Sequence, residues 1–171
     1  NLKLNVGTTE NWNHSNMFVA LNDTDFRLFA KATFSDDSTK TNAELRFEST
    51  DTNKLLIDDS GLLVPIGTGT VIVKIMDNNQ VIGTATVTIR AARKASSVSL
   101  DNPVVKLSKD VAADLATVTM QLRDQYGDKM PVTALTVTQT NTATAPAIVA
   151  LSADGDTVSL NGGMFSVAGV Y

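Results

Sequence analysis

Residues 58–75 read DDSGLLVPIGTGTVIVKI, a polar turn followed by a short apolar strand, a Gly-Thr-Gly corner and a long alternating strand. Glycine accepts positive φ angles, and Asp and Ser side chains bond their own backbone, so the DDSG segment predicts a chain reversal. After Gly69 the pattern alternates, with Val71, Val73 and Ile75 on one face. That period of two is typical of a strand with one buried face. The stretch therefore predicts part of a β-sandwich, and it shows no catalytic pattern.

The rest of the chain repeats this alternation in short segments separated by turn residues. A loop with an apolar anchor at Trp12, Met17 and Phe18 is expected over residues 10–22, and SKDVAADLA (residues 108–116) allows at most one short helical turn. Short strands at regular spacing indicate an all-β sandwich or barrel. Residues 55–57 lead into the stretch at 58–75, and DNNQ at 77–80 is predicted to be a hairpin loop. Further strands are predicted around residues 1–7, 26–34, 45–48, 84–89, 98–100, 117–123, 135–137, 158–160 and 165–167.

Composition limits the classes of protein to consider. Aromatic residues make up only 5% of the 171 residues, so each core must be built mainly from Val, Leu, Ile and Ala. The formal net charge of −4 argues against a nucleic-acid partner, which requires a basic surface. No apolar run approaches the length of a membrane span, and the absence of cysteine removes disulfides and thiolate chemistry. The chain starts at Asn1 without a signal peptide, so we expect a piece of a longer protein.

Two tandem domains are predicted, at residues 1–92 and 93–171. The polar segment AARKAS (residues 91–96) lies where one set of strands ends and the next begins. An internal repeat of low residue identity relates FSD at 34–36 to LRD at 122–124, and LLVPIG at 62–67 to MFSVAG at 164–169. The first domain continues well beyond residue 67, so we expect the second to lack about its last 20 residues within this chain.

Several short motifs resemble those of bacterial immunoglobulin-like (BIG) domains. They are SDDST at 35–39, DSG at 59–61 and GTGT at 67–70, with Phe47 where that family usually has Trp. VTMQLRDQYGDKM at 118–130 is similar to the opening of immunoglobulin-like repeats in Gram-positive surface-layer (S-layer) proteins. The resemblance covers residues 26–89 well and the second half weakly. It implies tandem immunoglobulin-like β-sandwiches in a secreted protein of the bacterial cell wall, although BIG domains also occur in adhesins and beside polysaccharide-degrading enzymes.

Candidate catalytic residues are sparse. His14 is the only histidine, and it stands beside Ser15 without a nucleophile elbow or an obvious orienting carboxylate. We therefore predict that the protein is not an enzyme, and we assign no catalytic residue.

Acidic pairs are the only candidate metal ligands. Carboxylate oxygens suit Ca²⁺, but Arg27 stands where a calcium loop containing Asp23 and Asp25 would need an oxygen ligand, so turn formation is the favoured interpretation. We assign no metal or cofactor residue. Calcium is left open, because S-layer assembly in the resembled family often depends on it. The pairs are Asp23/Asp25, Asp36/Asp37, Asp58/Asp59 and Asp154/Asp156.

Aromatic and basic side chains suggest contact surfaces instead of chemistry. Trp12, Phe18 and Phe29 could form a sugar-stacking patch, although a single Trp in a loop more often plugs the end of a sandwich. Outward-facing basic residues could supply polar contacts to neighbouring subunits; these are Arg27, Lys31, Arg46 and Lys74.

The resulting hypothesis is a structural segment of an S-layer protein. Its sandwiches would act as rigid spacers and self-assembly modules in a two-dimensional lattice at the cell surface. The partners would be other copies and other domains of the same chain, with no nucleic acid and no membrane insertion. The alternative is an adhesin stalk or a carbohydrate-binding accessory module of a secreted protein.

Overall fold

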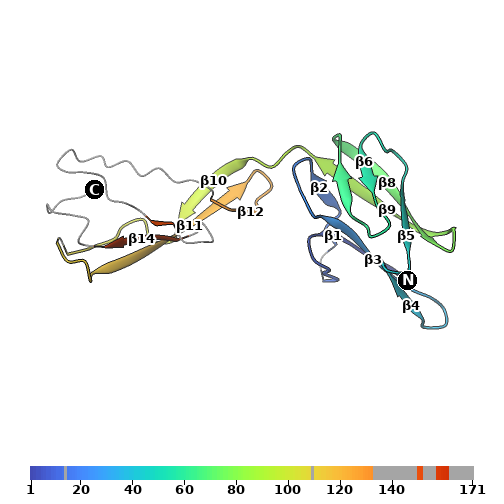
Figure 1. Cartoon of the computed structure of the whole chain (residues 1–171), viewed down its shortest axis with the longest axis horizontal. Helices are drawn as coiled ribbons and strands as arrows, with labels where there is room; N and C mark the ends of the chain where they lie inside the picture. Colours follow the sequence, from blue (N-terminus) through green and yellow to red (C-terminus); the bar gives the residue numbers. More distant parts are fainter. Residues whose placement is uncertain (14, 109, 133–149, 152–156, 162–171) are drawn as a thin grey trace. The chain divides into compact units, whose positions relative to one another are not determined.

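Figure 1 shows the computed structural model of the chain. The structure describes residues 1–13, 15–108, 110–132, 150–151 and 157–161, and within these every regular element is a strand. The chain divides into two compact units, Asn1–Arg93 (unit 1) and Lys94–Tyr171 (unit 2). The fold class is therefore all-β, as the alternating patterns predict.

One sheet of unit 1 is built around the fold-deciding stretch. Its order is β2 (Phe18–Ala20), β9 (Gln80–Arg90), β8 (Gly69–Asp77) and β5 (Arg46–Ser49). Strands β8 and β9 form a hairpin whose two turn residues, Asn78 and Asn79, have φ angles of 46° and 67°. Two successive positive φ angles match the right-handed twist of the strands, and Asn tolerates them well. The predicted hairpin at residues 77–80 is confirmed.

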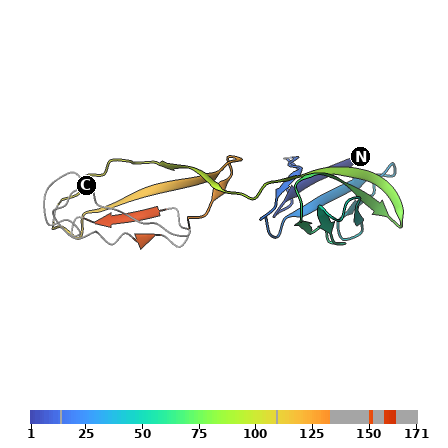
Figure 2. The same ribbon diagram turned by 90° about the horizontal axis from the view of Figure 1, so that it is seen from above.

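The facing sheet of unit 1 contains β1 (Leu2–Gly7), β3 (Arg27–Thr33) and β4 (Thr39–Thr41). A separate hairpin of β6 (Leu55–Ile57) and β7 (Leu63–Pro65) continues this layer (Figures 1 and 2). It joins the start of β3 through hydrogen bonds from Leu28 N to Gly61 O and from Leu63 N to Phe26 O, both 2.8 Å. The DDSG turn thus reverses the chain and also attaches the hairpin to β3.

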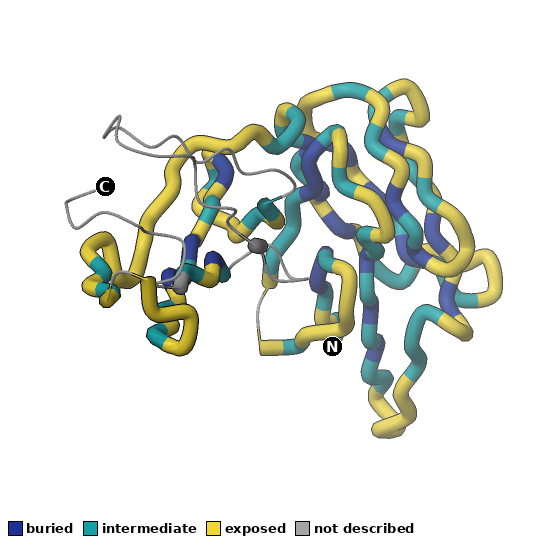
Figure 3. Tube along the Cα trace, turned by 60° about the vertical axis from the view of Figure 1, so that its left-hand side comes forward, coloured by how far each residue is buried: buried dark blue, intermediate teal, exposed yellow. Residues whose placement is uncertain are grey.

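Between the two sheets lies an aliphatic core. Alternate residues of β8 are buried, with Val73 and Ile75 fully inaccessible, whereas Ile72, between Val71 and Val73, is 48% exposed. The same alternation along the other strands of unit 1 is visible in Figure 3. Each fully buried Val, Leu or Ile side chain contributes about 1.5–3 kcal/mol of transfer free energy. The prediction of a core built mainly from aliphatic side chains is confirmed for unit 1.

Unit 2 contains one described sheet with the order β10 (Ala95–Leu100), β11 (Leu115–Asp124), β14 (Thr157–Asn161) and β13 (Ala150–Leu151), and β12 (Lys129–Met130) also pairs with β11. Val118, Met120 and Val158 are buried on one face. The turn after β11 is organised by Asp124, whose Oδ1 accepts hydrogen bonds from Tyr126 N (2.8 Å) and Asp128 N (2.9 Å).

Some details differ from the sequence predictions. Residues 18–20, expected in a loop, form β2, because a three-residue parallel strand is too short to show periodicity. Strand β4 was also missed, since Thr-Lys-Thr has no apolar alternation. In the segment 108–116, where the sequence allows one helical turn, the structure has two short turns. They are closed by hydrogen bonds from Val111 N to Ser108 O and from Asp114 N to Val111 O. The strands expected at 135–137 and 165–167 lie outside the described residues, as does the region bearing on the expected incomplete second domain.

Candidate functional site

Two of the acidic pairs, Asp36/Asp37 and Asp58/Asp59, lie in turns that the first residue of each pair organises. Asp58 Oδ1 accepts hydrogen bonds from Ser60 Oγ (2.6 Å), Ser60 N (2.9 Å) and Leu62 N (2.8 Å). The bond from the Ser60 hydroxyl, and after it the bonds from the backbone N–H groups of Leu62 and Ser60, lower the pKa of Asp58. Asp36 is held in the same way, since Ser38 Oγ donates to it at 2.6 Å and lowers its pKa.

In the part of the chain that the structure describes, no three His, Cys, Asp or Glu side chains lie close enough together to hold a metal ion. The Asp154/Asp156 pair and His14 lie outside the described residues. Ser15, the neighbour of His14, lines an open groove at one side of unit 1.

Asp23 has a different role at the point where the chain leaves unit 1. Its carboxylate forms a forked ion pair with Arg93, with Oδ1 2.5 Å from Nε and Oδ2 3.2 Å from Nη2. Both side chains are largely buried, at 4% and 14% exposure. Asp23 Oδ2 also accepts from Ala20 N at 2.9 Å. Paired and hydrogen-bonded charges of this kind tolerate burial, whereas either one alone would be costly.

Asn22 binds the backbone of the same residue, Arg93. Its side-chain Oδ1 accepts from Arg93 N at 2.6 Å, and its Nδ2 donates to Arg93 O at 3.3 Å. Leu21 N donates to Arg90 O at 3.1 Å, so the loop after β2 follows the end of β9. The guanidinium of Arg90 lies 3.8 Å from the ring centre of Phe18, a cation–π arrangement. Residues 18–23 and 90–93 together form what we call the exit clamp.

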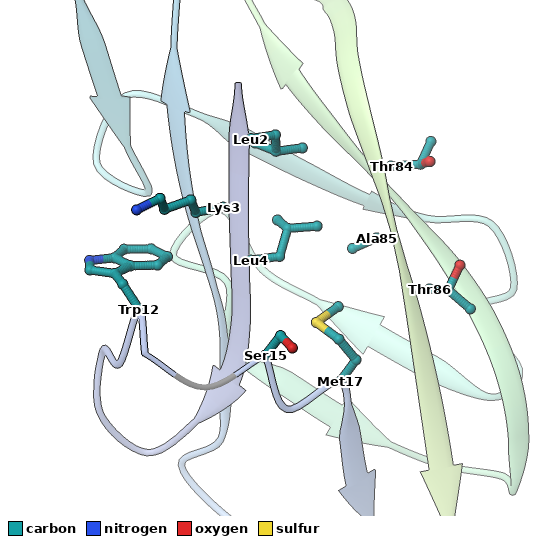
Figure 4. Close-up of a pocket in the computed structure, with 9 residues that line it drawn as sticks. All are labelled: Leu2, Lys3, Leu4, Trp12, Ser15, Met17, Thr84, Ala85 and Thr86. Carbon is teal, nitrogen blue, oxygen red and sulfur yellow. The ribbon is translucent and has the colours of Figure 1, made fainter.

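An open groove of about 480 Å³ lies between β1 and β9, at one side of the sandwich (Figure 4). Its apolar lining comes from Leu2, Leu4, Met17 and Ala85, and polar groups come from Lys3, Ser15, Thr84 and Thr86, with Trp12 at the rim. One end is narrow, because a Cβ atom at Gly83 would lie 2.5 Å from Cδ2 of Leu2.

The hydrogen-bond pattern shows how the backbone of β9 faces this groove. Thr88 N donates to Met17 O at 2.9 Å, away from β8. Antiparallel pairing directs alternate residues to opposite sides, so the N–H and C=O groups of Thr84 and Thr86 also point away from β8. Strand β2 covers β9 only from Thr88 to Arg90. In the described structure, the edge from Thr84 to Thr86 is therefore uncovered by a strand.

Strand β1 presents a similar edge from the other side of the groove. Val6 N donates to Asn16 O at 2.6 Å, away from β3, so the backbone groups of Leu2 and Leu4 face the same way. Within the described residues, two strand edges with available backbone groups thus border one partly apolar groove. Such a site can bind an extended polypeptide by adding a strand.

The predicted aromatic patch is dispersed over three elements. Trp12 is at the rim of the groove, Phe18 lies on β2 beneath Arg90, and Phe29 is on the outer face of β3 opposite Asn5. Among the outward basic residues, Lys74 is 3.4 Å from Glu48, and Arg27 donates to the Ser60 hydroxyl. Arg46 is exposed on β5, the strand that carries Glu48, and Lys31 lies half-buried on the outer face of β3.

Asn42 is a structural residue that the sequence reasoning missed. Its Oδ1 accepts from Ala30 N at 2.7 Å, and its Nδ2 donates to Leu28 O at 2.7 Å and to Ser60 O at 3.0 Å. The side-chain amide thus makes the hydrogen bonds to the backbone of β3 that a neighbouring strand would otherwise make. The available signal was weak, because one Asn in a polar segment between two predicted strands looks like an ordinary turn residue.

Comparison with known proteins identifies structural neighbours but no sequence family. No protein-family model and no curated protein matches the chain. The crystal structure of domains 4 and 5 of the S-layer protein SbsC is similar over 95% of this chain and 86% of that one, with 26% identity and a TM-score of 0.53. A structure of SbsC domains 4–9 is similar at 26% identity with a TM-score of 0.52, and the match spans 26% of its length. None of the described segments forms a helix suited to crossing a membrane.

Proposed function

We propose that this chain is a structural, non-enzymatic segment of a bacterial S-layer protein at the cell surface. The observation that carries the proposal is the similarity to SbsC domains 4 and 5, which extends over 95% of this chain at 26% identity. The match runs through both units and not through one common sandwich alone. The aliphatic core of unit 1 suits a spacer, and Asp58 and Asp23 serve in a turn and an ion pair, respectively.

We further propose that the units are tandem immunoglobulin-like domains. In unit 1 the layer β1-β3-β7-β6 and the layer β5-β8-β9 correspond to the ABED and CFG sheets of that fold. The parallel strand β2 extends the second layer beside β9. Strands β3 and β11 each lead into a similar tight turn, which is closed from Phe34 N to Ser38 O in unit 1 and from Asp124 N to Asp128 O in unit 2.

Electron microscopy of the complete protein tests this function. After removal of denaturant we expect ordered two-dimensional sheets with a fixed lattice, and we expect a variant that lacks residues 94–171 to change the lattice dimensions or abolish the lattice. Monodisperse rods that bind a glycan or a receptor would contradict the proposal and favour the adhesin or carbohydrate-binding alternative.

A further inference from the structure

We propose that two lysines on the outer face of the β1-β3-β4 sheet, Lys3 and Lys31, bind the acidic loop between β3 and β4 of a second copy. This loop carries Asp36 and Asp37. The inference rests on the proposed self-assembling function and specifies one contact between copies. Both surfaces belong to the same sheet of unit 1, so two copies related by a twofold axis make the contact twice.

The two lysines lie directly opposite each other. Lys3 of β1 is the register partner of Lys31 of β3. Side chains at such positions have Cβ atoms about 4.5–5.5 Å apart, and like charges there destabilise a sheet. Neither lysine forms an ion pair with another described residue. A partner that brings negative charge to this position removes the repulsion.

The sheet around these lysines supplies no compensating charge, because β1, β3 and β4 contain no Asp or Glu. Glu10, in the loop after β1, accepts a hydrogen bond from Trp12 Nε1 and makes no ion pair with a described lysine. Figure 4 shows Lys3 on the other side of β1 from Leu4, above the ring of Trp12. This face is therefore basic, although the chain has a net charge of −4.

The loop between β3 and β4 has the opposite charge. Its sequence is SDDS at 35–38, all four residues are exposed, and the loop projects from unit 1 in Figure 1. Asp36 Oδ1 accepts hydrogen bonds from Ser38 N at 3.0 Å and Ser38 Oγ at 2.6 Å, which fix the turn. Lys40, the first cation after the loop, is paired with Asp77 at 2.8 Å. The loop thus presents two carboxylates that have no cation partner among the described residues.

Other charges of unit 1 are already matched within the chain. The second acidic turn, Asp58/Asp59, lies beside Arg27, which donates to the Ser60 hydroxyl in that turn. The SDDS loop has no such neighbour, so it is the acidic turn that the lysine pair complements best. Ion pairs in the described structure use several further charges; these are Lys40–Asp77, Lys54–Asp51, Lys74–Glu48 and Arg93–Asp23.

The loop of the same chain does not reach the lysines. Lys31 and Asp36 are five residues apart along the β3–β4 hairpin, which is about 17 Å at about 3.4 Å per residue. An ion pair requires nitrogen and oxygen atoms within about 4 Å. A second copy, related by a twofold axis near Thr33, places the loop of each copy against the lysine pair of the other.

Sedimentation equilibrium of the whole chain at concentrations up to about 1 mM measures this contact. Exposed ion pairs are individually weak and screened by salt. We therefore expect a monomer–dimer equilibrium at low salt whose association constant falls at least about tenfold in about 0.5 M NaCl. Lys3→Glu should weaken association, whereas Arg46→Glu, the same charge change at an exposed position of the other sheet, should leave it within about twofold of the original.

A charge exchange between loop and face gives the sharpest test. One variant carries Lys3→Glu with Lys31→Glu, and the other carries Asp36→Asn with Asp37→Lys. Each variant alone brings like charges together, so neither should associate. An equimolar mixture brings opposite charges together at both contacts, so association should return.

A milder loop variant separates charge from folding. Asp36→Asn with Asp37→Asn keeps an acceptor oxygen for Ser38 and places Asn at a φ of 63°, which Asn tolerates. This variant should keep the urea-unfolding midpoint of the original chain and still fail to associate, because only the charges of the loop are lost.

Several results would overturn the inference. They are a chain that stays monomeric at low salt, a mixture that associates no better than its components, an asparagine variant that associates normally, and equal losses for Arg46→Glu and Lys3→Glu. Loss of binding to polygalacturonate, an acidic polysaccharide, in lysine variants that self-associate normally would identify a different partner and would equally refute the contact. If the complete protein still forms ordered sheets with both lysines changed to Glu, the proposed function stands and only this contact is refuted.

Discussion

Replacing Asn42 by alanine removes the side chain that completes the edge of β3. The Ala30 N–H and the Leu28 carbonyl, both on buried residues, lose their 2.7 Å partners. An unsatisfied buried polar group costs about 1–3 kcal/mol, and the half-buried position allows some rescue by water, so we expect a loss of about 2–3 kcal/mol in the free energy of unfolding of unit 1. With a urea m-value of about 1–3 kcal/mol/M, the unfolding midpoint falls by about 1–2 M.

The assay is urea unfolding followed by Trp12 fluorescence, which reports unit 1 because that unit contains the only tryptophan. The matched control is Asn53→Ala, an exposed turn residue whose side chain makes no hydrogen bond within the described structure. We expect this control to stay within about 0.5 kcal/mol of the original chain.

Asn42→Asp provides a sharper test of the same contact. An ionised carboxylate can still accept from Ala30 N, but it places negative charge against the Leu28 and Ser60 carbonyls, where the amide donated. That environment raises the pKa of the new Asp in the folded state. The contribution of the protonated carboxyl group to the free energy of unfolding is therefore fully present below the ordinary pKa of Asp, and it is lost as the pH rises through the folded-state pKa. We expect the gap between this variant and the original chain to narrow on acidification. A pH-independent gap, or an alanine variant as stable as the Asn53 control, would refute the assigned role of Asn42.

Three further changes probe other contacts by the same measurement. Gly61→Ala should destabilise unit 1 by about 2 kcal/mol or more, because Gly61 has a φ of 84° and a Cβ there would overlap the Leu28 carbonyl oxygen; an unchanged midpoint would contradict this turn geometry. Arg93→Ala should cost about 3 kcal/mol, since it leaves the buried Asp23 carboxylate without its cation, and a loss below about 1 kcal/mol would mean that the pair behaves like a surface salt bridge. The lowered pKa of Asp58 contributes stability above its ordinary value of 3.8, which is lost as pH falls through the folded value, so Asp58→Asn should show a shallower decline in stability on acidification, and an unchanged slope would count against it.

The elements best predicted from the sequence are those whose information is local. Alternation in β8 and β9 specifies both the strands and their buried faces, because one face must meet the core. The DDSG turn was also predictable, since its hydrogen bonds join residues only two to four positions apart. Local chemistry of this kind can be read from a single sequence.

Contacts between distant segments were not predictable in this way. Asn22 and Arg93 are 71 positions apart, and the residues next to each of them in the sequence do not indicate the exit clamp. Asn42 and Leu28 are separated by 14 positions, and their bond depends on a strand being absent from that edge of β3. The groove likewise follows from β2 being only three residues long, a boundary that residue periodicity does not define.

The parallel pairing of β2 with β9 would have a mechanical consequence if the chain were placed under tension. When the two ends of the chain are pulled, β2 is drawn toward its N-terminus and β9 toward its C-terminus, so the rungs between Phe18–Ala20 and Thr88–Arg90 are loaded in shear. Interstrand hydrogen bonds loaded in shear share the force and must break together, whereas those of a hairpin that is peeled apart break one at a time. With the Asp23–Arg93 pair loaded beside them, this short strand would act as a latch that sets the rupture rate of unit 1.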